Sequence, residues 1–518
     1  MKKSAAVALA LVTVGAVSTG GAWYTGTQLP GVLDNLIAEA NRQSADSLLG
    51  TGTSVRVELV SLETRLFTSS ARYRMIIDAP AKEGEPVHME ILFKDHIEHG
   101  PLPLSRLKRL NLWPVLVTSH YELEPSEYTQ KWFDAAKGAA PFVGQGAVGY
   151  NGSTWGTLVL TPLDFAPSPT TTVKFSGMTL EAEASKNARE VKVSGGMDSL
   201  VLNSTGDTPF QMDMQGLTVS SDQRLGSGDF YIGESTIKLA TTQIKFGDKP
   251  ALLIKDIAQT GSLQEAGSAL NGQIGYDIGK VSYDGKDIGG LRMLWSIKNF
   301  DSAAMQSLIK LYQDKLTPAQ QAAALGEEAP KPELSADEEA RLKADLDKLL
   351  AGKPQLALDN LTLTTEHGEA SLHVAVDLDK PEYFDLPPDE LARQLIDKLD
   401  AKLSVAKAVI ADGVRVQALV EGVTDAKAVE EQATMMTEMG SGMALGTGLV
   451  ILEGDALQST LHYADNKVTF NGQDMSVDEF VTLVMAKTGD MGGGLGDDPS
   501  AYDSQDGSQY DEGAEQPE

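Results

Sequence analysis

The strongest pattern in the chain is the alternation of apolar and polar residues between Thr53 and about Phe300. It is clearest in three segments, whose apolar members are Val55, Val57 and Leu59; Phe210, Met212 and Met214; and Leu291, Met293, Trp295 and Ile297. Successive side chains of a strand point to opposite faces of a sheet, so these segments are predicted strands with one apolar face. Such strands belong to antiparallel sheets that have one face covered.

A weak internal repeat runs through the same pattern. Phe175–Leu180, Met214–Val219 and Leu358–Leu363 each contain Gly or Asn, then an apolar residue, Thr and another apolar residue. Each Gly or Asn is read as a turn that starts a new strand. The irregular spacing of the copies excludes a strict solenoid. The predicted fold class is α+β and β-rich, with a long antiparallel sheet meander that is either flat or curved.

Helices are expected near the N-terminus and in the C-terminal 40% of the chain. The first covers Pro30 to Leu49, where apolar residues recur at helical spacing. Cap residues mark most of the later ones. These are Asp301 to about Lys315; a helix capped by Ser335 and Glu338 and ended by Gly352; Pro388 to Ile410; a helix from Thr424; and one capped by Ser476 and Glu479 that ends near Lys487. Strands return at Pro354–Leu378, and Leu449–Phe470 resembles a hairpin that turns between Ala464 and Lys467.

The N-terminus predicts a membrane anchor. Two lysines precede an uncharged stretch from Ser4 to Ala22, and Trp23 and Tyr24 follow it. About 19 uncharged residues nearly suffice to span a bilayer, and an aromatic pair suits the headgroup level. An uncleaved signal anchor that holds residues 4–24 in the membrane is favoured. The alternative is a secretory signal that is cleaved near Ser18 to Ala22. In both cases the bulk of the chain is exported.

Five regions are therefore expected along the chain. They are a signal anchor (1–24), a juxtamembrane helix (25–52), a β-rich exported region (53–300), a mixed helix and strand region that completes the fold (301–487), and an acidic tail (488–518). The tail holds nine acidic residues and no basic one, so it is predicted to be disordered.

Composition excludes several classes of function. The 518 residues include 73 acidic and 43 basic ones, a net charge of −30, and a surface of that sign argues against a nucleic-acid partner. The chain has no cysteine, which excludes disulfides, thiolate metal sites and cysteine nucleophiles.

Two further patterns carry little catalytic information. Gly144–Gly149 matches the dinucleotide-binding sequence G-x-G-x-x-G, but that motif requires a helix directly after it. A second turn and a strand are expected here instead, so nucleotide binding is not predicted. Glu122, Glu124 and Glu127 are read as a solvated face rather than as a glycosidase pair.

The methionine cluster near the C-terminus has three interpretations. Met435, Met436, Met439 and Met443 lie beside the uncharged run Met439–Leu452. Thioethers bind soft metals such as Cu(I), and they also form adaptable apolar surfaces for an acyl chain or a partner helix. The favoured interpretation is a helix end and a following strand packed in the core.

Two histidines, His96 and His99, lie three residues apart at a predicted strand end. Strand alternation places them on opposite faces, so they cannot bind one ion. Only His120 could approach His96, if Leu116–Leu123 pairs back across a hairpin. His99, on the apolar face, is expected to donate to a backbone carbonyl where the strand ends. No catalytic, cofactor-binding or metal-binding residue is assigned, and no cofactor is expected.

Three motifs in order along the chain resemble one known family. They are Ala22-Trp23-Tyr24-Thr25-Gly26, His99-Gly100-Pro101-Leu102-Pro103, and Leu461 to Gly472, LHYADNKVTFNG. The pattern is similar to the YdgA family of uncharacterised proteobacterial envelope proteins and covers Met1 to Lys487. The resemblance implies an inner-membrane anchor with a large periplasmic portion. It implies no established activity, and there are no catalytic residues to carry over.

Three functional hypotheses follow. The first is a non-enzymatic membrane-anchored envelope protein that binds apolar ligands, such as lipid acyl chains, or holds partner proteins of the envelope at the membrane surface. The second is a structural module in which sheet edges pair into a homo-oligomer. The third is a hydrolase of envelope polymer, which would need two carboxylates about 5 to 9 Å apart in a cleft, one of them with a raised pKa.

Overall fold

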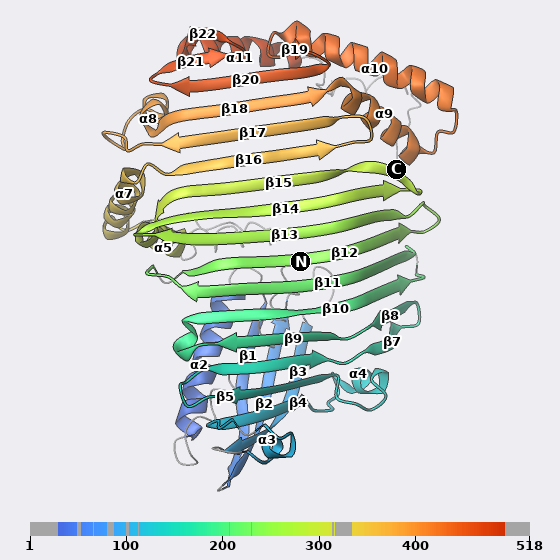
Figure 1. The fold of residues 1–518 in the computed structure, drawn as a ribbon, viewed down its shortest axis with the longest axis vertical. Coiled ribbons are helices and arrows are strands. Elements are labelled where there is room, and N and C mark those ends of the chain that lie inside the picture. The colour runs from blue at the N-terminus through green and yellow to red at the C-terminus, as the bar shows by residue number, and fades with distance from the viewer. Residues whose placement is uncertain are drawn as a thin grey trace, which may run out of the picture.

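The described part of the chain forms one very long antiparallel sheet with helices at its margins (Figure 1). The computed structural model describes residues 29–48, 53–65, 67–79, 87–99, 103–111, 113–206, 208–228, 230–312, 315 and 334–492. Within these residues all 22 strands join a single sheet. The predicted β-rich fold with a long antiparallel meander is confirmed.

The longest strands, of 15 or 16 residues each, lie in the middle of the sheet. The first nine are β1 Ser54–Thr64, β2 Thr68–Ala79, β3 Val87–His99, β4 Val117–Leu123, β5 Phe142–Val148, β6 Thr154–Leu160, β7 Leu163–Ser168, β8 Thr171–Phe175 and β9 Met178–Ala184. The middle strands are β10 Glu190–Ser204, β11 Phe210–Leu225, β12 Tyr231–Phe246, β13 Leu252–Ala266, β14 Ala269–Tyr283 and β15 Lys286–Asp301. The last are β16 Gln355–Thr364, β17 Glu369–Leu378, β18 Ile396–Ala406, β19 Ile451–Glu453, β20 Ala456–Ala464, β21 Lys467–Phe470 and β22 Gln473–Ser476.

Neighbours in the sequence are mostly neighbours in the sheet. β1 to β6 pair in order, β6 pairs with β9, and β9 to β18 continue in order. β7 and β8 extend this line, because β8 pairs with β10 beside β9. β18 then pairs with β20, whose second edge carries β19 and β21, and β22 follows β21. The strand direction turns strongly between β1–β3 and β10–β18 (Figure 1).

The sheet has a buried core at its N-terminal end. Helix α2 (Leu29–Leu48) packs Leu33, Ile37 and Ala40 against the inward residues of β1–β6. The fully buried members on the sheet include Tyr73, Met75, Phe93, Ile97 and Val117. Burying a large apolar side chain contributes about 1.5–3 kcal/mol, so this cluster dominates the stability of the N-terminal end. The helix predicted at Pro30–Leu49 is confirmed.

A smaller core closes the C-terminal end of the sheet. Helix α11 (Val477–Gly492) packs Phe480 and Leu483 against Tyr463, Val468 and Phe470. The helix begins at the predicted capping box of Ser476 and Glu479, which is confirmed. The helix continues to Gly492, past the predicted end at Lys487, and the remainder of the acidic tail lies outside the described residues. So does the predicted anchor, residues 1–24.

The other helices lie beside the strand ends (Figure 1). They are α3 Leu104–Lys108, α4 Gln130–Ala135, α5 Ser302–Leu311, α7 Ala336–Ala351, α8 Pro388–Leu395, α9 Lys407–Glu421 and α10 Ala426–Thr447, with a short 3-10 turn at Lys186–Ala188. The predicted caps at Asp301 and at Ser335 with Glu338 are confirmed. Asp425, one residue after the predicted Thr424, caps α10. The short helices α3 and α4 were not predicted. None of the described helices has the length and apolar character that crossing a membrane requires.

The prediction of one helix over Pro388–Ile410 is wrong. The segment forms the whole of α8, the whole of β18 and the start of α9. Leu391, Leu395, Leu399 and Leu403 recur at helical spacing, but Leu399, Ala401, Leu403 and Val405 also alternate with polar residues. Pairing with β17 and β20 on both edges decides between the two periods in favour of the strand.

The interpretation of the internal repeat as strand starts is right for Gly177, after which β9 begins at Met178, and wrong for Gly216 and Asn360. Gly216 and Asn360 lie inside the continuous strands β11 and β16, and Gly177 separates β8 from β9, which both pair with β10. Gly177 and Gly216 have positive φ angles of 92° and 69°. A single residue in this conformation shifts the side-chain alternation by one, which in a sequence resembles the turn between two strands.

Gly216 belongs to a line of skipped residues that crosses the long strands. The pairing omits one residue in each of the five strands β10 to β14, and the four pairings between these strands keep their register on both sides. We call these residues the irregular column: Asp198, Gly216, Ala240, Asp256 and Gly279. In β11 the apolar residues Phe210, Met212 and Met214 before it, and Leu217 and Val219 after it, are all half-buried. The shift therefore occurs in neighbouring strands together, and their pairing is preserved.

Four residues fasten the α9–α10 pair to the β16–β17 turn. The backbone N–H of His367 donates to Asp412, its Nδ1 lies 2.7 Å from Asp412, and Arg415 donates to Asp412 at 2.7 Å. Arg415 also donates two hydrogen bonds to Glu430 of α10. Burial alone would raise the pKa of Asp412, but hydrogen bonds from Thr365, His367 and Arg415 outweigh it and lower the pKa to about 2.

Gly216→Ala should destabilise the sheet more than a substitution at an ordinary left-handed glycine. A Cβ at Gly216 would lie 2.8 Å from the Cβ of Ala240, whereas Gly267, with a similar φ of 67°, has nothing within 4 Å of the added atom. Gly267→Ala should cost about 1 kcal/mol and Gly216→Ala roughly 2 kcal/mol or more. Urea unfolding followed by circular dichroism measures both. Equal losses would show that the irregular column tolerates a side chain there.

Asp412→Asn should lower the free energy of unfolding by roughly 2 kcal/mol at pH 7. Because the folded pKa of Asp412 lies below its unfolded value, its contribution is present above about pH 4 and is lost as the pH falls towards 2. The difference between variant and wild type should therefore shrink over that range in urea unfolding. Glu430→Gln, at an exposed partner of Arg415, is the control and should cost under about 1 kcal/mol. A difference that stays constant with pH would contradict this role.

Candidate functional site

One column of the sheet is apolar on ten consecutive strands. Its members are directly opposite one another from β10 to β20: Met197, Leu217, Leu239, Ile257, Ile278, Leu291, Leu363, Ala370, Val405 and Leu457. Neighbouring strands lie about 4.8 Å apart, so the column is roughly 40 Å long.

Adjacent columns widen this column into a surface. In the column two positions away, Val219 and Ile237 are opposite each other, Gln259 follows on β13, and Tyr276, Met293, Leu361, Leu372 and Leu403 continue the line. We call these two columns, with Trp295 and Leu356 beside them, the apolar face. Thr218, Lys238 and Arg292 alternate with its members and therefore point to the other side, the polar face.

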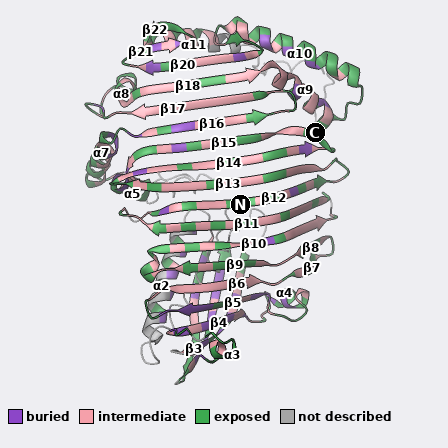
Figure 2. Ribbon diagram, viewed as in Figure 1, coloured by how far each residue is buried: buried purple, intermediate pink, exposed green. Residues whose placement is uncertain are grey.

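The apolar face continues into the cores at both ends of the sheet. Register leads from the buried Tyr121 through Gly144, Leu158 and Leu180 to Gly195 on β10. At the other end, Leu399, Leu461 and Tyr463 pack with α11. Between these ends large side chains are open to solvent, among them Ile237, which is 42% exposed, and Leu363, which is 43% exposed. Figure 2 shows the same contrast, with mostly intermediate residues across the middle strands.

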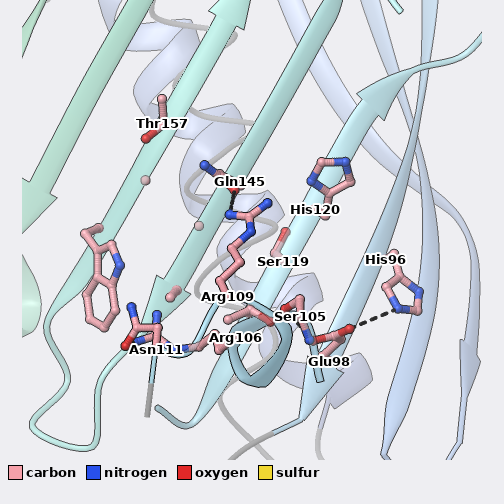
Figure 3. A pocket seen from close by; sticks show the side chains of 15 residues that line it. His96, Glu98, Ser105, Arg106, Arg109, Asn111, Ser119, His120, Gln145 and Thr157 are labelled. Carbon is pink, nitrogen blue, oxygen red and sulfur yellow. Dashed lines mark hydrogen bonds and ion pairs between the residues drawn. The ribbon is translucent and has the colours of Figure 1, made fainter. Parts of the chain in front are cut away.

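A cavity of about 450 Å³ lies on the polar face of β3–β6, beneath α3 (Figure 3). His96 and Glu98 of β3, His120 of β4 and Gln145 of β5 line its floor, and Arg106 and Arg109 reach in from α3 and the residue that follows it. Helix α3 is held over the strands because the backbone N–H and the hydroxyl of Ser105 both donate to Glu98.

The two arginines of the cavity are held by neutral groups. Arg106 donates from Nη2 to Asn111 at 2.8 Å and to the Trp113 carbonyl at 3.2 Å, and its guanidinium lies 5.6 Å from the ring centre of Trp155. Arg109 donates from Nη1 to the Gln145 amide oxygen at 3.1 Å. Burial lowers the pKa of Arg106, but an arginine remains charged at neutral pH. The sequence prediction missed both residues, because α3 has only five residues and little periodicity.

The structure brings His96 and His120 together, the two histidines that the strand alternation allowed to approach each other. His96 and His120 are directly opposite on β3 and β4, whereas His99 lies on the other face, as predicted. The Nε2 atom of His99 lies 3.0 Å from the Ser69 hydroxyl, so the expected bond to a backbone carbonyl is wrong. His96 lies 3.9 Å from Glu98. Among the described residues there is no group of three or more His, Asp or Glu side chains suited to holding a metal ion.

The glycine motif has a packing role. Gly144–Val148 belong to strand β5, a turn and then β6 follow, and the expectation of a strand rather than a helix is confirmed. The ring of Tyr121 lies against Gly144, where an added Cβ would overlap it. This burial raises the pKa of Tyr121. Glycine therefore makes room for an aromatic ring in the core.

Glu122, Glu124 and Glu127 were the candidates for a glycosidase pair. Two of them form ion pairs on the polar face. Lys94 lies 2.6 Å from Glu122, and Arg72 donates two hydrogen bonds to Glu124 at 2.9 and 3.0 Å. Glu127 is exposed in the segment after β4.

Comparison with known proteins gives the family. The family described as "Bacterial protein of unknown function (DUF945)" matches residues 1–478. The chain belongs to this family. It is 26% identical to Protein YdgA of Escherichia coli (strain K12) over 93% of this chain and 97% of that protein. It is 24% identical to the uncharacterized protein YihF of the same strain over 91% and 97%. An uncharacterized protein of Haemophilus influenzae is 22% identical over 60% of this chain and 86% of its own length. The resemblance to the YdgA family is confirmed.

The favoured interpretation of the methionine cluster is wrong, because its side chains are not packed in the core. The uncharged run is helical up to Thr447 at the end of α10, and Met435 and Met443 are 61% and 68% exposed. The residues of α10 that are buried are small, namely Ala433, Thr437 and Ser441 at intervals of four. Because these small residues occupy the buried side of the helix, the methionines point outward.

Exposure of the methionines predicts the order of their oxidation. Dilute hydrogen peroxide should convert Met435, Met439 and Met443 to sulfoxides well before Met75, which is fully buried in the N-terminal core. Peptide mass spectrometry over a time course measures each rate in the same sample, so Met75 is the internal control. Equal rates for Met443 and Met75 would show that α10 is covered.

Proposed function

We propose that this protein is a non-enzymatic, membrane-anchored envelope protein that binds lipid acyl chains on the apolar face. The observation that carries this proposal is the ten-strand apolar column, which is closed by helices at its two ends and open in its middle. Isolated exposed apolar residues are ordinary on a protein surface, but a large contiguous apolar patch marks a binding surface.

The free energy available on the apolar face suits an acyl chain. Seven of its large side chains are more than a third exposed: Ile237, Tyr276, Leu291, Trp295, Leu356, Leu363 and Leu403. Each methylene group that leaves water contributes about 0.8 kcal/mol, so a chain that buries most of its length gains several kcal/mol without any hydrogen bond. A column roughly 40 Å long accommodates an extended acyl chain.

Exposure along the strands supports a curved sheet whose inner face is apolar. In β9, Met178, Leu180 and Ala182 are less exposed than Thr179 and Glu181, which point the other way. The same alternation recurs in the first half of β10. Two faces of a flat uncovered layer would be similarly open to water, whereas the inner face of a curved layer is shielded by its own neighbours. A concave apolar face would shield most of an acyl chain from water.

The location is proposed from the N-terminal sequence and the family resemblance. Residues 4–24 would anchor the protein in the inner membrane as a single-pass segment, with the bulk of the chain in the periplasm. If the segment is cleaved instead, the protein is periplasmic. In either case the sheet would work next to a source of lipid.

The cavity on the polar face gives less support to a hydrolase. Its lining contains one carboxylate, Glu98, rather than a pair. The carboxyl groups with a lowered pKa are those of Glu58, Asp78, Glu265, Asp287, Asp301, Glu338, Asp379, Asp400, Asp412, Glu430 and Glu479, whereas a general acid would need a raised pKa.

Native mass spectrometry of the full-length protein, released from detergent after loading with phospholipid, tests the proposal. Wild-type protein should retain lipid. A variant with Ile237→Glu and Leu363→Glu should retain several-fold less, because two carboxylates in the apolar face would have to be desolvated by the acyl chain. Both positions are already well exposed, so the variant is expected to fold.

The matched control places the same two charges on the polar face. Thr236→Glu and Thr362→Glu lie next to the substituted positions in the same strands and point the opposite way. This control should retain lipid as the wild type does. A wild-type protein without lipid, or equal losses in both variants, would refute acyl-chain binding on this face. A lipid-free dimer would indicate that a second copy covers it.

A further inference from the structure

The cavity beneath α3 has an excess of positive charge, whereas the chain as a whole has an excess of negative charge. The protein carries a net charge of −30, yet the cavity is lined by two guanidinium groups and one carboxylate. That carboxylate, Glu98, already accepts two hydrogen bonds from Ser105. A local excess of positive charge within a strongly acidic protein attracts small anions to that place.

The two arginines of the cavity also differ from three arginines of the strands that are ion-paired. Arg72, Arg74 and Arg292 each lie 2.7 to 2.8 Å from a carboxylate oxygen. Within the described ranges, Arg106 and Arg109 form no ion pair, and the buried Nε of Arg106 has no hydrogen-bond partner. In a chain where acidic residues outnumber basic ones, most arginines can find a carboxylate partner. The guanidinium groups of Arg106 and Arg109 have none among the described residues, so both can bind an anion from solution.

The remaining groups of the cavity are arranged to hold this charge in place. Asn111 and the Trp113 carbonyl fix the guanidinium of Arg106 over the Trp155 ring, and Gln145 fixes that of Arg109 (Figure 3). Because these partners are neutral, they orient the guanidinium groups without cancelling their charge. Guanidinium donors that are already oriented lose little side-chain entropy when they bind an anion.

We propose that this cavity binds a phosphate ester, with Arg106 and Arg109 as the residues that contact the phosphate. Guanidinium groups donate paired hydrogen bonds to phosphate oxygens, and two of them match the several oxygens of a phosphate better than the two oxygens of a carboxylate. His96 and His120, opposite each other on the floor, add polar nitrogen atoms beside it.

The size of the cavity indicates a ligand larger than inorganic phosphate. A volume of about 450 Å³ falls within the usual range for small-molecule sites and would accommodate a sugar phosphate or a phospholipid headgroup. The shared chemistry is the phosphate ester. This site is on the polar face and does not depend on lipid binding by the apolar face.

Isothermal titration calorimetry of the full-length protein tests this site with four soluble probes. Glucose 6-phosphate and dihexanoylphosphatidylglycerol carry phosphate esters, while glucose and inorganic phosphate are the matched compounds without the ester or without the sugar. The wild type should bind at least one of the two esters and should not bind glucose. Inorganic phosphate should bind more weakly than the ester that binds.

The double variant Arg106→Gln with Arg109→Gln should weaken ester binding roughly tenfold or more, because each charged hydrogen bond contributes over tenfold in affinity. Arg109→Gln alone changes an exposed side chain, so this variant is expected to fold. If the double variant does not fold, the single variant should still show weakened ester binding. Arg292→Gln removes the same charge from an ion-paired arginine of the polar face and should leave the affinity within about twofold of the wild type.

Each outcome decides the proposal. Arginine-dependent binding of glucose 6-phosphate indicates a free phosphate ester, and arginine-dependent binding of the short-chain lipid alone indicates a headgroup; both support the site. If neither ester binds, or if the folded arginine variants bind as the wild type does, the cavity is not a phosphate-ester site. A lipid that still binds the arginine variants would instead indicate the apolar face.

Discussion

The register between neighbouring strands is the constraint on which the rest of the structure depends. Direct pairing puts Met197, Leu217 and Leu239 opposite one another, and the same relation continues across the sheet to Leu457. A slip of one residue in any strand would turn its apolar side chains to the polar side. The irregular column could have caused such a slip, but it occurs at matching positions in the five strands β10 to β14, and the pairings between these strands resume in register beyond it.

This register produces a protein whose stability and whose proposed activity come from different parts of one surface. Near β1–β6 the apolar face is covered by α2 and forms a fully buried core. Near β20 it is covered by α11. The long strands between them are held by hydrogen bonds to two neighbours and do not require a covering layer to stay paired. Their apolar side chains are therefore free to contact a ligand, and α2 and α11 leave them accessible.

Sequence periodicity predicts the strands and the face on which each residue lies. It fails where the same sequence pattern fits two different structures. The opposite faces of His96 and His99 and the approach of His120 follow from alternation alone. Gly216 looks like a turn because a shift in alternation and a strand boundary produce the same pattern. Leu399 and Leu403 fit a helix as well as a strand, and only the pairing of β18 decides. The exposure of Met443 depends on which side of α10 packs. The Arg106 and Arg109 cavity requires contacts between segments far apart in the sequence.

The central claim is that the open middle of the apolar face receives acyl chains, and photo-crosslinking tests it most directly. A phospholipid with a diazirine in its acyl chain would be bound to the full-length protein and irradiated, and the modified residues would be identified by peptide mass spectrometry. The account predicts adducts on apolar-face residues of β10–β17, such as Leu217, Ile237 and Leu239, and few on Thr218 and Lys238 between them. Adducts spread equally over both faces, or absent from these strands, would contradict it.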